Sequence, residues 1–82
     1  MSLSDDIRKF AYEEYIEPAR KKGLSEVTIR SGDLHNKMGL KNRMPAVCGA
    51  LGTDSFKTQY SVKLIRRSPV TNGANVYFTF QI

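Results

Sequence analysis

The stretch that decides the fold runs from residue 26 to residue 51 and reads EVTIRSGDLHNKMGLKNRMPAVCGAL. Its first five residues alternate apolar and polar side chains, which predicts a short half-buried strand. Ser31 then stands as the N-cap of a two-turn helix that ends at Gly39. After the turn 40–42, Asn42 caps another helix with Pro45 in its first turn. The core face of that helix is predicted to hold Met44, Val47, Cys48 and Leu51.

The residues before this stretch predict one long helix. Apolar side chains recur at three- and four-residue steps between Ser4 and Lys22, with charged residues between them. Ser4 is the expected N-cap, and Gly23 supplies the stop. Pro18 lacks a backbone N–H, so we expect a kink or an early end there. The basic last turn, residues 20–22, is interpreted as a solvated helix end.

The residues after this stretch predict a hairpin. Segment 52–60 is less regular, although the spacing of Phe56 and Tyr60 allows a short turn of helix. Strands are expected over 61–67 and 76–82, and the loop 68–74 that joins them contains Asn72-Gly73, a dipeptide suited to a tight turn. No repeat or linker interrupts the chain, so residues 1–82 are expected to form a single α+β domain.

The charge is unevenly distributed along the 82 residues. Residues 1–26 carry five basic and six acidic side chains, whereas residues 27–82 carry eight basic and two acidic ones, a net charge of +6. An excess of this kind attracts polyanions, and nucleic acid is the first candidate. The sequence therefore favours a nucleic-acid partner over an anionic membrane.

Several classes of function find no support. The longest apolar stretch, 44–51, is far shorter than the about 18 residues of a membrane span, and Asp5 and Asp6 interrupt any secretory leader, so a cytoplasmic location is expected. Cys48 and His35 are the only cysteine and histidine, which argues against a metal site. Cys48 is interpreted as a buried hydrophobe and His35 as a partly buried histidine. With no phosphate-binding loop either, we expect neither an enzyme nor a cofactor.

The order helix, strand, helix, turn, helix, strand, loop, strand resembles the winged helix-turn-helix superfamily of DNA-binding domains. The resemblance covers nearly all of residues 5–82 and rests on element order and length. The sequence of residues 27–35 and 38–43 also resembles that of short uncharacterised prokaryotic proteins. One departure concerns the turn: the tight bacterial pattern anchored on Gly39 expects a small residue in place of His35 and an aliphatic one in place of Pro45. The turn is therefore expected to be longer or looser.

The resemblance implies a regulator-like or accessory protein that binds double-stranded DNA. The helix from Asn42 would enter the major groove, with Asn42 and Arg43 reading bases. The residues expected to face outward are Asn42, Arg43, Ala46, Gly49, Ala50 and Thr53. Phosphate contacts are expected from Lys37, Lys41, Lys57 and one of Arg66 and Arg67, and the N–H groups of Ser31 and Gly32 could add another. The wing would contribute Thr71, Asn72 and Asn75.

Two alternatives remain open. Small residues on a helix face also allow close packing, so the Ala46/Gly49/Ala50 face could bind a protein partner or form a homodimer. In that case the domain would be an adaptor and its charge would serve solubility. RNA binding is the weaker alternative, because the aromatic motif of the common RNA-recognition sheet is missing.

Overall fold

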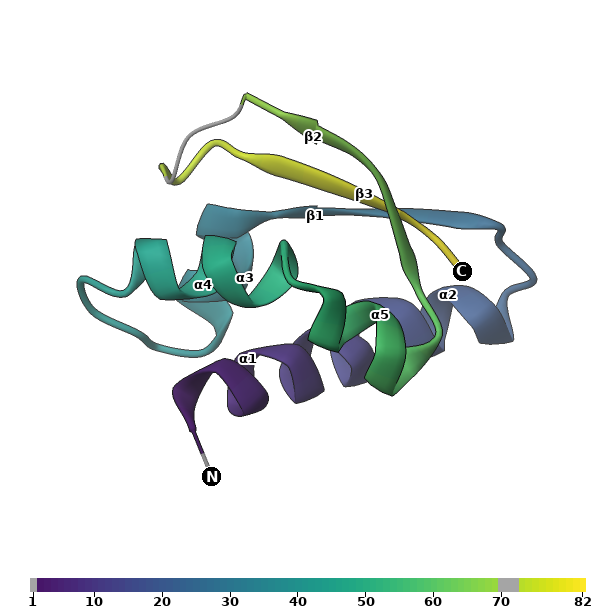
Figure 1. The fold of residues 1–82 in the computed structure, drawn as a ribbon, viewed down its shortest axis with the longest axis horizontal. Helices are drawn as coiled ribbons and strands as arrows, with labels where there is room; N and C mark the ends of the chain where they lie inside the picture. The colour runs from purple at the N-terminus through teal and green to yellow at the C-terminus, as the bar shows by residue number, and fades with distance from the viewer. Residues whose placement is uncertain (1, 70–72) are drawn as a thin grey trace.

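The computed structural model describes residues 2–69 and 73–82 and places a sheet on one side of a layer of helices (Figure 1). The helical elements are α1 (Leu3–Ala11), the π-helical segment η1 (Tyr12–Ile16), α2 (Glu17–Lys21), α3 (Ser31–Lys37), α4 (Met44–Leu51) and α5 (Asp54–Tyr60). The strands are β1 (Glu26–Arg30), β2 (Lys63–Ser68) and β3 (Tyr77–Gln81). The α+β class expected from the sequence is confirmed.

The N-terminal helix differs from the prediction at its cap, and near Pro18 it is irregular rather than ended. Ser2, not Ser4, is the N-cap, and its hydroxyl accepts a hydrogen bond from the Asp5 N–H at 3.2 Å. The helix does not end early at Pro18, and it continues to Lys21. The irregularity lies before the proline, where η1 places the Glu17 N–H on the Tyr12 carbonyl. This wider turn accommodates a residue that cannot donate to the ordinary helical ladder.

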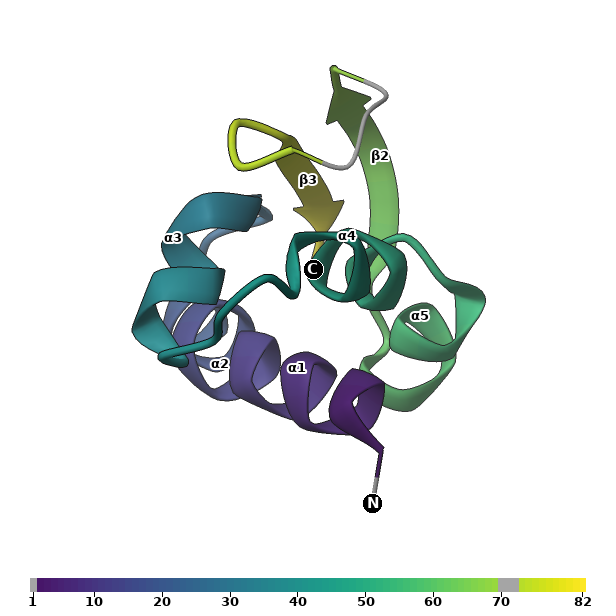
Figure 2. The same cartoon turned by 90° about the vertical axis from the view of Figure 1, so that its left-hand side faces the viewer.

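The sheet has the strand order β1-β3-β2, and both pairings are antiparallel. Figure 2 shows that the helices lie on one face only. Phe78 and Phe80 of β3 point toward the helices, where they join a fully buried core that includes Ile29 of β1. The opposite face of the sheet carries alternate residues such as Thr28 and Thr79, whose hydroxyls lie 3.0 Å apart.

The two hairpin strands form where the alternation indicated, with shifted ends. β2 begins at Lys63 because Ser61 has a left-handed conformation (φ 56°) and still belongs to the turn after α5. β3 is Tyr77–Gln81, so Val76 and Ile82 flank the strand, although Val76 is fully buried as expected. A bulge between Leu64 and Arg66 interrupts the β2–β3 ladder.

The irregular segment 52–60 contains α5, and two arginines of the N-terminal helix hold it in place. Arg8 is almost fully buried and donates to the Gln59 side chain at 3.2 Å. Arg20 donates to the carbonyls of Tyr60 and Ser61, both at 2.9 Å, and so caps the end of α5. The interpretation of the whole last turn 20–22 as solvated is therefore wrong for Arg20.

Candidate nucleic-acid interface

The turn between α3 and α4 comprises residues 38–43, and it contains two left-handed residues, Gly39 (φ 67°) and Asn42 (φ 54°). His35, which is nearly buried, accepts a hydrogen bond at Nε2 from the Arg43 N–H at 3.2 Å. His35, which stands where the tight pattern expects a small residue, therefore has a structural role in this turn. The turn is longer, and the imidazole of His35 fixes its end to α3.

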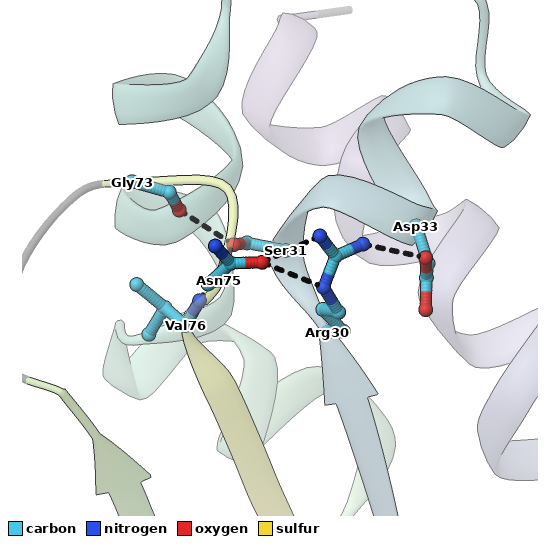
Figure 3. Close-up of polar contacts among 6 residues, drawn as sticks. All are labelled: Arg30, Ser31, Asp33, Gly73, Asn75 and Val76. Atoms are coloured by element: carbon cyan, nitrogen blue, oxygen red, sulfur yellow. Dashed lines mark hydrogen bonds and ion pairs between the residues drawn. The ribbon is translucent and has the colours of Figure 1, made fainter.

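The predicted capping residues of both helices are wrong. Asn42 lies in the left-handed region and precedes the N-cap position of α4, which Arg43 occupies without a side-chain cap. Ser31 is the first residue of α3 rather than its cap. Its hydroxyl bonds the hairpin instead, donating to the Gly73 carbonyl at 2.7 Å and accepting from the Val76 N–H at 3.3 Å (Figure 3).

The start of α3 is also joined to the hairpin through its backbone. The Ser31 N–H donates to Val76 and the Gly32 N–H to Ala74, both at 2.9 Å. These N–H groups are therefore occupied and do not offer the phosphate site suggested by the sequence. Gly32 is needed here because a Cβ at this position would lie 2.7 Å from the Ala74 carbonyl oxygen.

A polar cluster reinforces this junction at the end of β1. The Arg30 guanidinium donates to Asn75 through Nε at 3.1 Å and through Nη2 at 2.5 Å, and it pairs with Asp33 at 2.8 Å (Figure 3). Asp33 is the acidic residue in the first turn of α3, so Arg30 compensates its charge locally. Asn75, expected to contribute to a wing contact, fixes the hairpin to β1 and α3.

The outward face of α4 is smaller than predicted. Ala50 is only 1% exposed and packs in the core, so it cannot belong to an outer face that also holds Asn42, Arg43, Ala46, Gly49 and Thr53. Gly49 is exposed, with open space around the position of a Cβ, whereas Ala46 is half-buried. Thr53 is exposed after the helix, where its hydroxyl donates to the Ala50 carbonyl at 3.1 Å. The postulated Ala46/Gly49/Ala50 face is corrected to Ala46 and Gly49.

The predicted cations lie on different parts of the surface. Lys37 sits over the Tyr15 ring, 4.7 Å from its centroid, and so faces the N-terminal helix. Lys57 belongs to α5, where it lines two adjoining surface hollows of about 390 and 280 Å³ together with Val62 and Lys63. Figure 1 shows α5 far from the turn between α3 and α4. The structure therefore does not bring Lys37 and Lys57 into one site with the turn.

Arg66 and Arg67 point to opposite faces of the sheet, as adjacent strand residues must. Arg66 is opposite Thr79 and is exposed on the face without helices. Arg67 is opposite Phe78 on the helical face, and its guanidinium lies 4.9 Å from the Phe78 ring centroid. A Cβ on Gly52 would lie 3.2 Å from Arg67 Nη1, which places this arginine next to the end of α4.

The turn and the hairpin lie at the same end of the molecule. The turn carries the exposed residues Lys41, Asn42 and Arg43. This turn lies at the end of the molecule where β2 ends and β3 begins (Figure 1), and α3 and α4 lie between the turn and these strands (Figure 2). The predicted contact residue Asn72 and its neighbour Thr71 lie outside the described residues. We define the turn–hairpin end as residues 41–43, 67–69 and 73–75.

Cys48 is fully buried behind this end, and its thiol donates to the Gly73 carbonyl at 3.8 Å. Burial raises the pKa of the Cys48 thiol, which keeps it protonated and unreactive in the folded state. At pH 8 we expect iodoacetamide to modify Cys48 about a hundredfold or more slowly in native protein than in denaturant, because reaction requires unfolding. Mass spectrometry of timed samples measures both rates. Equal rates would show that the thiol is accessible.

Within residues 2–69 and 73–82, no group of three or more His, Cys, Asp or Glu side chains is arranged to hold a metal ion. None of the helices in these ranges is both long and apolar enough to cross a membrane. Comparison of the chain with protein-family models, curated proteins and solved structures gives no match.

Proposed function

We propose that this chain is a winged helix-turn-helix domain that binds double-stranded DNA through its turn–hairpin end. The observation that carries the proposal is that the exposed Lys41-Asn42-Arg43 turn lies at the same end of the molecule as the hairpin. The sheet order β1-β3-β2, with α3 and α4 between β1 and β2, supports the same assignment. In this assignment α5 is an additional helix between α4 and the wing.

The proposed contacts are mainly to phosphate. α4 has no charged side chain between Met44 and Leu51, so hydrogen bonds to base edges are proposed to come from the residues at the start of the helix. Arg43 and Asn42 carry the donors that read base edges, and Lys41 supplies a phosphate contact. Arg67, on the helical side of the hairpin, is the candidate for a second phosphate contact, which would require its guanidinium to leave the Phe78 ring beside Gly52. Lys37, Lys57 and Arg66 contribute only to the general positive field.

Binding to a random-sequence duplex and to a single strand, each followed by fluorescence anisotropy over a salt series, tests the proposal. Phosphate contacts release counterions, so duplex affinity should fall steeply as salt rises. Single-strand binding should be weaker. No duplex binding at low salt would contradict the proposal.

Two substitutions in the turn separate base reading from phosphate contact. On a duplex obtained by site selection, Arg43→Ala should cost about 1–3 kcal/mol of binding free energy and have little effect on random DNA, because a base contact is lost. Lys41→Ala should weaken both duplexes alike and reduce the slope of log affinity against log salt by about 1. The same anisotropy titrations measure both variants. Equal losses on the two duplexes for Arg43→Ala would exclude base reading by this residue.

The second candidate function is a protein-binding adaptor. The observation that favours it is the charge-free surface of α4, where Gly49 lies in open space beside the half-buried Ala46. Such a surface admits a close approach by a partner helix. An interaction that is insensitive to salt and is lost in Gly49→Lys would favour the adaptor over the DNA-binding protein.

A further inference from the structure

The two edges of the sheet are protected to different degrees. The β2 edge carries a bulge and the basic residues Lys63, Arg66 and Arg67, features that discourage pairing with another strand. The β1 edge has regular pairing to β3 throughout Glu26–Arg30, with no bulge and no proline. β1 is therefore the edge that is open to a further strand.

The hydrogen-bonding groups on this edge can be assigned from the register. Ile82 donates to the Ser25 carbonyl and Ser31 to the Val76 carbonyl, both at 2.9 Å. Because antiparallel bonding alternates between residues, Ser25, Val27, Ile29 and Ser31 bond to β3. The N–H and C=O groups of Glu26, Thr28 and Arg30 consequently point away from the sheet. Among the described residues, no side chain bonds to the backbone of Thr28.

The sequence of β1 is complementary to itself in the antiparallel direction. With a two-fold axis at Thr28, the partner's Thr28 lies opposite Thr28, and the partner's Arg30 lies opposite Glu26. This register matches the outward groups, because Thr28 is centred in a hydrogen-bonded pair. We propose that two copies of this chain associate through β1, which joins their sheets into one six-stranded sheet.

Four main-chain hydrogen bonds would hold the edges together. The two Thr28 residues exchange N–H···O bonds, and each Arg30 N–H donates to the partner's Glu26 carbonyl. The Arg30 carbonyl is not counted, since the N-cap carbonyl accepts the first bond of α3. On the outer face, each Glu26 carboxylate would meet the partner's Arg30. That guanidinium still has two N–H groups beyond its bonds to Asp33 and Asn75.

Apolar residues near the edge agree with this assembly. Leu24 is 52% exposed two residues before β1, and Val27 is only half-buried on the helical face. In the same register, Val27 would lie opposite the partner's Ile29, whose side chain is already fully buried within its own chain, so the exposed apolar contribution comes from Leu24 and Val27. The interface uses none of the turn–hairpin residues, so it stands independently of DNA binding.

Sedimentation equilibrium over a concentration series, compared for the wild-type chain, Thr28→Pro and Thr28→Val, tests the proposal. We expect a monomer–dimer equilibrium for the wild type. Thr28→Pro removes one N–H from each copy and should raise the dissociation constant about tenfold or more. Thr28→Val is the matched control, because it keeps the N–H and the branched shape, and it should dimerise like the wild type.

A second variant and a second measurement keep the test decisive if Thr28→Pro fails to fold. Glu26→Lys would place a cation opposite the partner's Arg30 and should weaken the dimer while leaving circular dichroism unchanged. In the wild type, the Thr28 amide should exchange hydrogen more slowly in concentrated than in dilute solution. A monomer at every concentration would overturn the proposal, as would a dimer that Glu26→Lys leaves unchanged.

Discussion

Gly32→Ala is expected to lower the free energy of unfolding by about 1–3 kcal/mol, since an added methyl group must displace backbone. The new Cβ would lie 2.7 Å from the Ala74 carbonyl oxygen and 3.2 Å from the Ala74 Cβ. This carbonyl cannot retreat without loss of its hydrogen bond from the Gly32 N–H. Urea denaturation followed by circular dichroism at 222 nm, a standard helix signal, measures the loss.

Gly49→Ala is the matched control, because it is the same substitution in a helix that leaves the added methyl group in open space. Nothing lies within 4 Å of the added Cβ. Alanine is a better helix former than glycine by about 1 kcal/mol in a helix interior, so this variant should be more stable than the wild type. If Gly32→Ala were also stabilised, α3 and the hairpin would not be in close contact.

The contacts between α3 and the hairpin also bear on the proposed DNA binding. Ser31 and Gly32 hold the returning arm of the hairpin against α3, and Arg30 binds Asn75 beside them. The hairpin and the start of α3 are thus positioned as one unit. A Gly32→Ala protein that remains folded should bind duplex DNA less tightly although no proposed DNA contact has been changed.

Phe56→Ala is expected to give the largest loss of stability, about 3–5 kcal/mol, because it leaves a cavity in the core. Phe56 is fully buried, and its ring packs edge-to-face on Phe80 with centroids 5.1 Å apart and on Tyr60 at 5.7 Å. A domain of this size has a total stability of about 5–10 kcal/mol. Thermal and urea unfolding should therefore show a protein near the limit of folding.

Two further variants make the comparison interpretable. Phe56→Leu retains most of the apolar volume and should lose clearly less stability than Phe56→Ala. Thr58→Ala changes an exposed residue of the same helix, and its effect should stay within about 0.5 kcal/mol. Similar losses for Phe56→Ala and Thr58→Ala would mean that α5 contributes no packing to the core.

The sequence predicted those elements whose signal is local. Alternation in 26–30 and 76–82 and helical spacing in 44–51 led to β1, β3 and α4, because burial on one face imposes these periods on the residues. The buried Cys48 was likewise correctly interpreted from its apolar neighbours. Cap positions failed at Ser4, Ser31 and Asn42, since a serine or asparagine near a helix start can equally bond elsewhere.

The candidate site was only partly predictable for a related reason. Charge and spacing singled out Lys41, Asn42 and Arg43, which lie together on one turn. No local signal shows that Lys37 lies over Tyr15 or that Ala50 faces the core. The role of His35 in fixing that turn was also missed, although His35 stands where the turn pattern expects a small residue.

What the sequence determined by itself is the α+β class, the approximate order of its elements and the basic character of residues 27–82, because periodicity and charge are properties of neighbouring residues. Only the tertiary structure decided which cations share a surface, that Arg20 caps α5, and that Gly32 admits the hairpin. The contacts of Arg20 and of the Ser31–Gly32 junction join residues 40 or more positions apart. Such contacts produce no periodic pattern in the sequence, because they form only when the sheet and the helices pack together.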